Sequence, residues 1–276
     1  MRNFKQILSF IVLIFFQLIF GVHADERPAC KDLWHKLGIQ ERVFQSVSSS
    51  VNLAEKIQSD KKRFSQFYQG IRRSECQKDW TVLVYMQGRN DLSAYALWDL
   101  YEMEARFEGG TRHTGSSEKL DVVVQVELQE KEKSAYRLAL YEGKTIFDPA
   151  LTKESFATKS ILGIESPILK VLPVSNETTE SKKLDDFLDW GVQAFPSKHV
   201  MLVVWGHGQG WLYREKLNNK NLNKTGALAL NFETGSFLTT GNIRKSATRA
   251  SRVHHASKPF DIYLADACYM QRKKRA

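Results

Sequence analysis

The 276-residue chain is 42% hydrophobic and 26% charged, with a formal net charge of +9 at pH 7, a composition typical of an ordinary globular protein. The excess of basic residues is scattered and accompanies no nucleic-acid-binding motif, so nucleic acid is not an expected partner. Three cysteines are too few for a disulfide-stapled scaffold, and no Cys/His spacing suits zinc, so we expect no cofactor.

The first 24 residues have the pattern of a secretory signal peptide. Arg2 and Lys5 give a positive start, an almost wholly apolar run extends from Ile7 to Val22, and Val22-His23-Ala24 resembles a small-x-small cleavage site. The alternative is a membrane anchor, but the run is short for a spanning helix, which needs roughly 20 residues, and it contains Gln17. We therefore expect cleavage after Ala24 and a secreted or periplasmic protein with no stable membrane anchor.

Residues 25–78 are predicted to form a helical N-terminal segment. Between Cys30 and Cys76, apolar residues recur at three- and four-residue steps, and Ser48–Ser50 is expected to separate two helices. The segment could be a pro-segment or a helical layer packed on the core domain, and the sequence leaves both open. An exported chain with three cysteines keeps one free thiol. We expect Cys30 to pair with Cys76 and Cys268 to stay reduced, although spacing alone does not establish this.

The core domain is predicted over residues 79–270. Apolar runs bounded by turn signals predict strands at Trp80–Met86, Leu120–Leu128 and Tyr136–Tyr141, and the third could pair with its neighbour as a hairpin. A helix is expected from about Leu92 to Phe107.

Polar residues around this helix are given structural roles. Asn90 or Asp91 can cap its start by accepting backbone N–H bonds. Glu102 and Glu104 are expected to be solvated or rim charges rather than an acid/base pair.

The second half of the chain alternates helices with further strands. The stretch Thr145–Val174 has too little periodicity for a prediction. The elements expected after it are a helix at Ser181–Phe195 ended by Pro196, a strand before His207, an exposed polar loop at Tyr213–Thr225, a small hairpin of Ala227–Phe232 and Ser236–Leu238, and a basic helix from Thr239 or Thr240 to about His254, with His254 and His255 at the surface. This order of elements predicts an α/β fold with a largely parallel sheet and helices on both faces.

Two strands end in residues that can do chemistry. The apolar run Val200–Trp205 leads to His207 between two glycines, and the run Phe260–Ala265 leads to Asp266 and Cys268. Because parallel strands end at the same edge of a sheet, a thiol and an imidazole can meet there. Alone, His207 would be read as a hydrogen-bonded turn histidine and Cys268 as a small buried hydrophobe. Together they favour catalysis.

The chemistry expected of this pair is nucleophilic. A cysteine acts as its thiolate, and a nearby histidine, with its nearly neutral pKa, is the usual proton acceptor. Gly206 and Gly208 let a substrate backbone approach, and the backbone N–H groups near Gly208 and Cys268 could form an oxyanion hole. The GHGQG sequence contains no serine elbow and no phosphate loop, and the chain has no HExxH motif.

The same residues resemble a known family. The blocks WTVLVYM with the following Asn90-Asp91-Leu92, LVVWGHGQGW, and FDIYLADACYM, over roughly Trp80 to Met270, resemble the clostripain family of cysteine peptidases, relatives of caspases, gingipains and legumains. The resemblance implies a caspase-like fold, a mainly parallel sheet sandwiched between helices. It also implies His207 as general base and acid and Cys268 as nucleophile.

The resemblance further implies a preference for basic substrates. Asp266, two residues before the cysteine, matches the family's acidic S1 residue and would pair with Arg or Lys of a protein or peptide substrate; the alternative is a turn-capping carboxylate. Because family members are often zymogens that cut themselves at basic sites, Lys216, Lys220 or Lys224 could be such a site. Calcium assists some members, but no calcium loop is visible in this sequence.

Two features depart from the family pattern. Gly206 stands where the family often has Asp, which could loosen the local hydrogen bonding. The residues after the cysteine end in the basic tail 271–276, which has no packing pattern and suggests a truncated or frame-altered end. The resulting alternative is a catalytically incomplete fragment of the same fold, which acts as a binding module or has no function.

Overall fold

The computed structural model describes residues 27–37, 52–68, 72–107, 115–130, 134–175, 177–208 and 226–268. The strands are β1 (Lys78–Gly88), β2 (Leu120–Leu128), β3 (Ser134–Leu140), β4 (Ile168–Pro173), β5 (Ser197–Gly206), β6 (Ala227–Leu228), β7 (Leu238–Thr239) and β8 (Ile262–Ala267). The α-helices are α2 (Cys30–Lys36), α3 (Leu53–Phe67), α4 (Ser93–Glu104), α5 (Lys153–Phe156), α6 (Glu180–Ala194) and α7 (Thr240–His254), and short 3-10 turns span Arg73–Glu75 and Ile161–Gly163.

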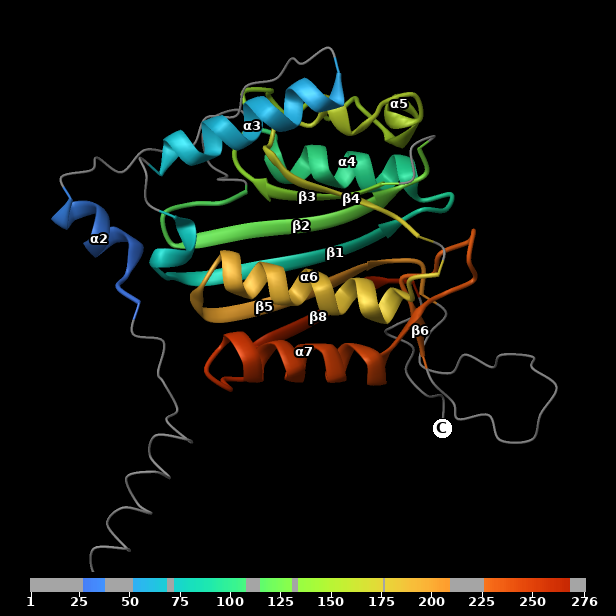
Figure 1. Ribbon diagram of the computed structural model, residues 1–276. Helices are drawn as coiled ribbons and strands as arrows, with labels where there is room; N and C mark the ends of the chain where they lie inside the picture. The colour runs from blue at the N-terminus through green and yellow to red at the C-terminus, as the bar shows by residue number, and fades with distance from the viewer. Residues whose placement is uncertain are drawn as a thin grey trace, which may run out of the picture.

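A six-stranded sheet in the order β4-β3-β2-β1-β5-β8 forms the centre of the molecule (Figure 1). Strands β2, β1, β5 and β8 are parallel to one another, while β3 and β4 join antiparallel at one edge. Helices cover both faces of the sheet. The predicted α/β fold, a mainly parallel sheet between helices, is confirmed, as is the hairpin of β2 and β3.

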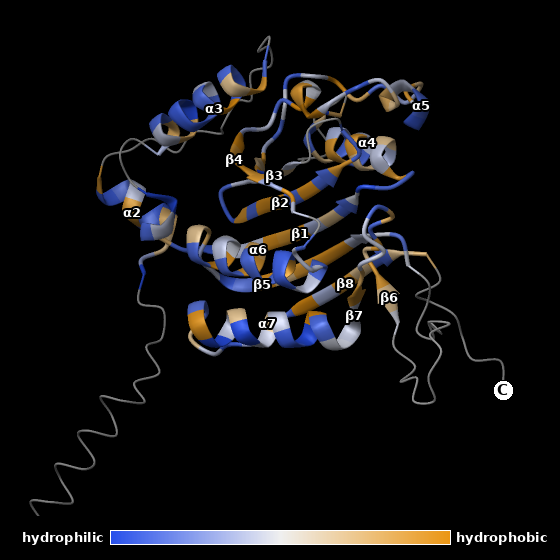
Figure 2. Cartoon of the chain, turned by 45° about the vertical axis from the view of Figure 1, so that its right-hand side comes forward, coloured by the Kyte–Doolittle hydropathy of each residue, from blue (hydrophilic) through white to orange (hydrophobic). Residues whose placement is uncertain are grey.

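The central strands are buried on both faces because nearly every residue in them is apolar. In β1, Leu83 and Tyr85 pack under α6 and α7, whereas Val84 and Met86 face the layer of α4 and α5. Successive side chains of a strand point to opposite faces, so a continuous apolar run fills both cores. Figure 2 shows these strands coloured mainly as hydrophobic between more polar helices.

The helices that flank the site begin at caps encoded in the sequence. The Thr179 hydroxyl accepts from the backbone N–H of Lys182 at the start of α6. Thr239 forms a capping box with Asn242 at the start of α7, which settles the choice between Thr239 and Thr240. Each cap satisfies backbone N–H groups that lack a partner within the helix.

The N-terminal segment is tied to the core domain. Cys30 and Cys76 form the expected disulfide, and Cys268 is free. Helix α3 lies along β4, where its buried Asp60 accepts from the backbone N–H of Ile168 at 3.0 Å and pairs with Lys56 at 3.1 Å. These contacts pack the segment against the core domain.

Several sequence predictions are wrong. Glu104 is buried rather than solvated, since its carboxylate accepts from the backbone N–H groups of Glu165 and Ser166 at 2.8 Å each. His255 is buried at the end of α7. Neither Asn90 nor Asp91 is the N-cap of α4, because the cap position is Leu92, which makes no side-chain cap bond.

Some predictions fall outside the described residues. They concern the signal peptide, the Ser48–Ser50 break, the polar loop from Tyr213 and the tail 271–276. Within the ranges that are described, no helix combines the length and apolar character needed to cross a bilayer.

Candidate active site

The tips of β5 and β8 bring the predicted pair to one edge of the sheet. Gly206 is paired with Ala267 in the parallel register of these strands. His207 and Cys268 are the next residue of each strand, so both follow directly from neighbouring strand ends. Cys268 is exposed, and the side chain of His207 is partly buried. This is the edge where open α/β sheets carry their sites.

The two glycines around His207 are required by the local backbone. Gly206 has a φ of 142°, which side-chain-bearing residues rarely adopt. A Cβ on Gly208 would lie 2.6 Å from the carbonyl oxygen of Cys268 and 3.3 Å from its backbone nitrogen. The structure thus brings together the backbones of Gly208 and Cys268, the two residues predicted for the oxyanion hole.

The imidazole of His207 is held on two sides by residues that were not predicted to be functional. Its Nε2 lies 2.6 Å from Oδ1 of Asp91, in the turn after β1. Its ring stacks on Phe232 with centroids 5.0 Å apart and planes inclined by 10°. Both neighbours are distant in sequence, so only the fold places them against the histidine.

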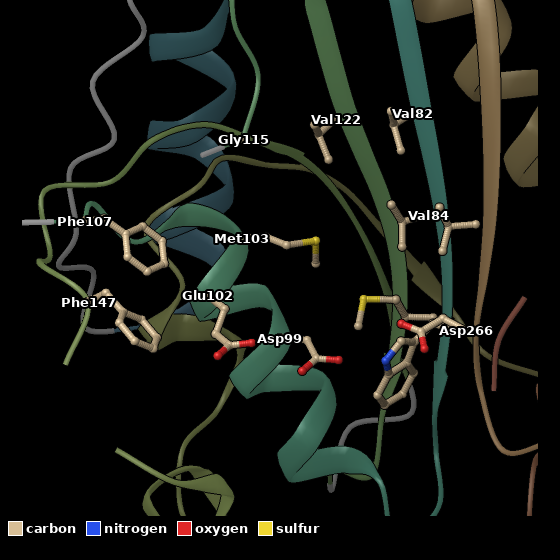
Figure 3. Close-up of a pocket in the computed structure, with 13 residues that line it drawn as sticks. Val82, Val84, Asp99, Glu102, Met103, Phe107, Gly115, Val122, Phe147 and Asp266 are labelled. Atoms are coloured by element: carbon tan, nitrogen blue, oxygen red, sulfur yellow. The ribbon is translucent and has the colours of Figure 1, made fainter. Parts of the chain in front are cut away.

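Asp266 lines a cavity of about 680 Å³. Its exposed side chain comes from β8, while Asp99 and Glu102 reach the same cavity from α4 (Figure 3). Burial raises the pKa of Asp99 to about 6, and the negative charges of Glu102 and Asp266 add to this rise. The cavity therefore joins apolar walls to a cluster of carboxylates that favour a cation.

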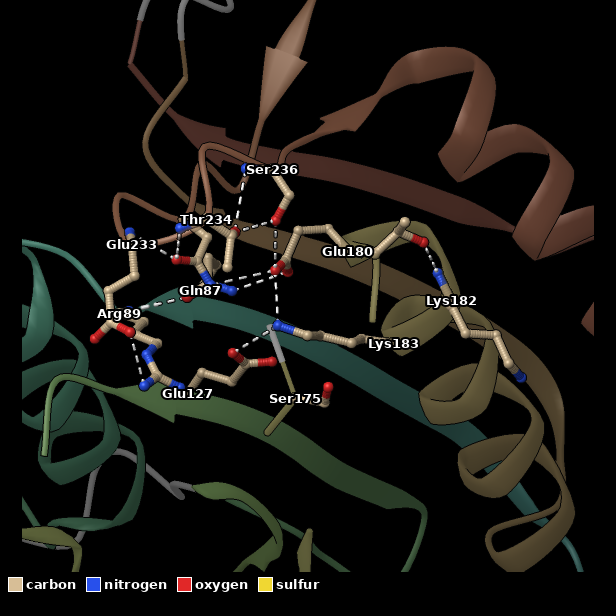
Figure 4. Close-up of polar contacts among 12 residues, drawn as sticks. Gln87, Arg89, Glu127, Ser175, Glu180, Lys182, Lys183, Glu233, Thr234 and Ser236 are labelled. Atoms are coloured by element: carbon tan, nitrogen blue, oxygen red, sulfur yellow. Dashed lines mark hydrogen bonds and ion pairs between the residues drawn. The ribbon is translucent and has the colours of Figure 1, made fainter. Parts of the chain in front are cut away.

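A buried polar network lies beneath the site at the ends of β1 and β2. The Glu180 carboxylate, fully buried at the start of α6, accepts from Tyr85, Gln87 and Lys183 at 2.7–2.8 Å. Lys183 also donates to Glu127 at 3.0 Å (Figure 4). Burial raises the pKa of Glu127, and the charge of Glu180 raises it further, whereas Lys183 lowers it. The network ties the start of α6 to β1 and β2, and β1 lies next to β5 in the sheet.

Among the described residues, no group of three or more His, Cys, Asp or Glu side chains is arranged to hold a metal ion.

The family assignment rests on a match over most of this domain. The model of the clostripain family, peptidase family C11, matches residues 84–273, which is more than half of the chain. The chain belongs to the clostripain family. The matched range contains His207, Asp266 and Cys268 and runs from β1 to beyond β8.

Solved clostripain-family structures are also similar to the chain. A secreted C11 cysteine protease from Bacteroides thetaiotaomicron, in complex with an irreversible peptide inhibitor, is 18% identical with a TM-score of 0.44, over 70% of this chain and 43% of that one. A second structure from that organism, "iotapain", is 14% identical, with a TM-score of 0.45 and coverage of 70% and 47%. An inactive zymogen C11 protease from Parabacteroides distasonis is 19% identical, with a TM-score of 0.43 and coverage of 70% and 43%.

The chain spans less than half the length of these clostripain-family structures. A search of curated proteins gave no match. The Lys216, Lys220 and Lys224 sites lie outside the described residues.

Sequence reasoning missed three residues of the candidate site. Asp91 was assigned to a cap, Phe232 to a hairpin strand, and Asp99 to no role. The Asn-Asp pair that follows β1 at the sheet's carboxyl edge was the available signal for Asp91. Nothing in the local sequence indicated the other two.

Proposed function

We propose that the chain is a secreted cysteine endopeptidase of clostripain type that cleaves after Arg or Lys, with His207 and Cys268 as its dyad. The observation that carries this proposal is the pairing of Gly206 with Ala267, which puts the imidazole and an exposed free thiol on adjacent strand tips. Family membership supports the same chemistry.

The mechanism forms and then hydrolyses an acyl-enzyme. His207 accepts the proton from Sγ of Cys268, and the thiolate attacks the scissile carbonyl carbon. The carbon–nitrogen bond then breaks as His207 returns the proton to the leaving amine. Water, deprotonated by His207, cleaves the thioester and regenerates the thiol. Backbone N–H groups near Gly208 and Cys268 would stabilise the oxyanion.

Asp266 would select the basic residue before the scissile bond. Its exposed carboxylate, with Asp99 and Glu102 nearby, gives the edge of the site a negative charge that suits a guanidinium or ammonium group. The same preference would allow self-cleavage at Lys216, Lys220 or Lys224.

A second candidate is a binding module without activity. The observation that favours it is the edge strand β8, in which Ile262, Tyr263 and Leu264 are each more than 40% exposed. Such a surface could pair with a strand of another molecule.

The proposal can be tested with fluorogenic peptides in which Arg, Lys or Ala stands directly before the fluorescent group. We expect cleavage after Arg and Lys but not Ala, and none with Cys268→Ala. Asp266→Asn should raise KM for the Arg peptide about 10- to 100-fold, the range for removing one charged partner. No thiol-dependent cleavage of any peptide would favour the binding module instead.

Mass spectrometry of the purified chain tests self-cleavage. Fragments that end at Lys216, Lys220 or Lys224 should form in the wild type and be absent in Cys268→Ala. Identical fragments from both proteins would show that another protease makes them.

A further inference from the structure

The candidate base is constrained more tightly than a simple dyad requires. Asp91 reaches Nε2 of His207 at 2.6 Å, and Phe232 covers one face of the ring at a centroid distance of 5.0 Å. One neighbour therefore fixes a ring nitrogen and the other fixes the ring plane.

The turn after β1 is built to present Asp91. Asn90 is buried, and its Nδ2 donates to the carbonyl oxygens of Gln87 and Leu230 at 3.2 and 2.8 Å. Its Oδ1 accepts from the backbone N–H of Leu92 at 2.8 Å. Because Asn90 makes these internal bonds, the neighbouring carboxylate of Asp91 is left to face the histidine.

Phe232 is held in place by polar contacts rather than by its own burial. The ring is 54% exposed, but the residues on either side of it are anchored. Glu233 pairs with the buried Arg89 at 2.9 Å, and the Asn231 Oδ1 accepts from the backbone N–H groups of Glu233 and Thr234. Ser236 donates to the buried Glu180 at 3.2 Å. Figure 4 shows this anchoring around Glu180 and Arg89.

The chemistry of Asp91 determines the tautomer of the ring. An ionised carboxylate can only accept a hydrogen bond, so Nε2 must donate to it. In the neutral imidazole the lone pair is then on Nδ1, which becomes the atom that exchanges the proton with Cys268. A phenyl face against the ring also favours the imidazolium that forms during the reaction.

We propose that Asp91 and Phe232 are positioning residues that hold His207 in its Nε2–H tautomer and fixed ring plane, so that the site works as a triad with an aromatic support. The expected effects on kcat rest on the proposed function, whereas the expected tautomer and ring orientation of His207 do not. Asp91 and Phe232 act through His207 and touch neither the thiol nor the scissile bond.

Kinetics of the full chain supply the first test. Asp91→Ala should lower kcat for the Arg peptide about 100-fold while KM changes little, a loss smaller than the ~10⁴-fold measured for an asparagine variant of a serine-protease triad. Asp91→Glu should recover part of the rate, because its carboxylate can still only accept from Nε2, whereas Asp91→Asn should not, because its amide N–H can donate to the ring and favour the other tautomer. Phe232→Ala should lower kcat about 10-fold, and Phe232→Tyr should restore it.

Two control variants remove matched groups far from the site. Asp32→Asn changes an exposed carboxylate on α2, and Leu37→Ala removes an apolar side chain that is 53% exposed. Both should keep wild-type kcat. Thermal unfolding of Asp91→Ala should match the wild type, since a hydrogen bond to an exposed carboxylate contributes little to folding.

The nitrogen chemical shifts of the His207 ring supply a test that needs no catalysis. The wild type should show a protonated Nε2 and an unprotonated Nδ1 in the neutral ring, and Asp91→Ala a mixture of tautomers. If the wild type shows this tautomer but has no peptidase activity, the proposed function is wrong, but the positioning role of Asp91 is retained. An active protein whose rate and tautomer are unchanged in Asp91→Ala would overturn the inference.

Discussion

At the scale of single residues, Gly208 sets how closely the two strand tips approach. A Cβ there would meet backbone atoms of Cys268 and the Cβ of Ala267 at 2.6–3.3 Å, and backbone cannot move aside cheaply. We expect Gly208→Ala to lower kcat/KM at least 10-fold, because moving the tips of β5 and β8 apart by even a fraction of an ångström changes the distance between the thiol and the imidazole.

Gly163→Ala is the matched control for this substitution. A Cβ at Gly163 meets nothing within 4 Å, so the variant should keep full activity. Peptide hydrolysis by both variants, with circular dichroism to verify folding, makes the comparison. Equal activity of the two variants would show that the close approach at Gly208 is not needed.

The sequence could predict that His207, Gly208 and Cys268 follow strand ends at one edge of the sheet, because each comes within three residues of an apolar run. It could not predict the contacts of the imidazole. Asp91 is 116 residues from His207, and Phe232 reaches the ring only because Arg89 and Glu180 anchor its loop. Such contacts depend on tertiary placement, which local patterns do not encode.

At the scale of elements, the end of α4 carries a buried carboxyl group whose ionisation opposes folding. Burial raises the pKa of Glu104 to about 7 from 4.5, despite the backbone N–H groups that it accepts from. The folded state thus holds this proton more tightly than the unfolded chain does. The protonated carboxyl group therefore adds to the free energy of unfolding. This contribution, about 3 kcal/mol at most, is fully present below pH 4.5 and is lost as the pH rises through 7.

Glu104→Gln should remove this pH dependence, because an amide does not titrate. Urea unfolding between pH 4 and 8 gives the free energy of unfolding of both proteins, and the difference between wild type and variant at each pH measures the contribution of Glu104. Glu118→Gln, which changes an exposed carboxylate, is the control and should follow the wild type. Parallel curves for wild type and Glu104→Gln would contradict the assignment.

Elements with strong periodicity or uniform apolarity were predictable, and weaker ones were not. Helix α6 and strand β2 match their predicted ranges within one residue. Strand β4 was missed because it pairs only with β3, is mostly half-exposed and ends in Pro173, so its residues carry no clear two-residue alternation.

At the scale of the whole molecule, one disulfide connects the N-terminal segment to the start of β1. Cys30 and Cys76 are fully buried and close a loop across a sequence separation of 46 residues. We expect Cys30→Ser with Cys76→Ser to lower the free energy of unfolding by about 2–4 kcal/mol. Urea denaturation measures this, and an unchanged midpoint would show that α2 and α3 dock without the bond.

The buried disulfide and the exposed Cys268 should differ in their reactivity toward thiol reagents. A mild thiol reductant should keep Cys268 reduced without opening the disulfide, because no reductant can reach the buried sulfurs in the folded state. Iodoacetamide should label one cysteine in the native protein and three after denaturation with reductant. Mass spectrometry counts the labels, and native labelling of Cys30 or Cys76 would contradict their burial.

Strand β8, which carries Asp266, is bordered by β5 on one side, and no other described strand pairs with it. The residues Ile262 and Leu264 of this strand are both exposed. An open edge of this kind attracts strands from other molecules and is a common start of aggregation. The thiol proposed as nucleophile therefore follows the strand of the sheet most prone to intermolecular pairing, so loss of soluble protein on concentration should lower any thiol-dependent activity in proportion.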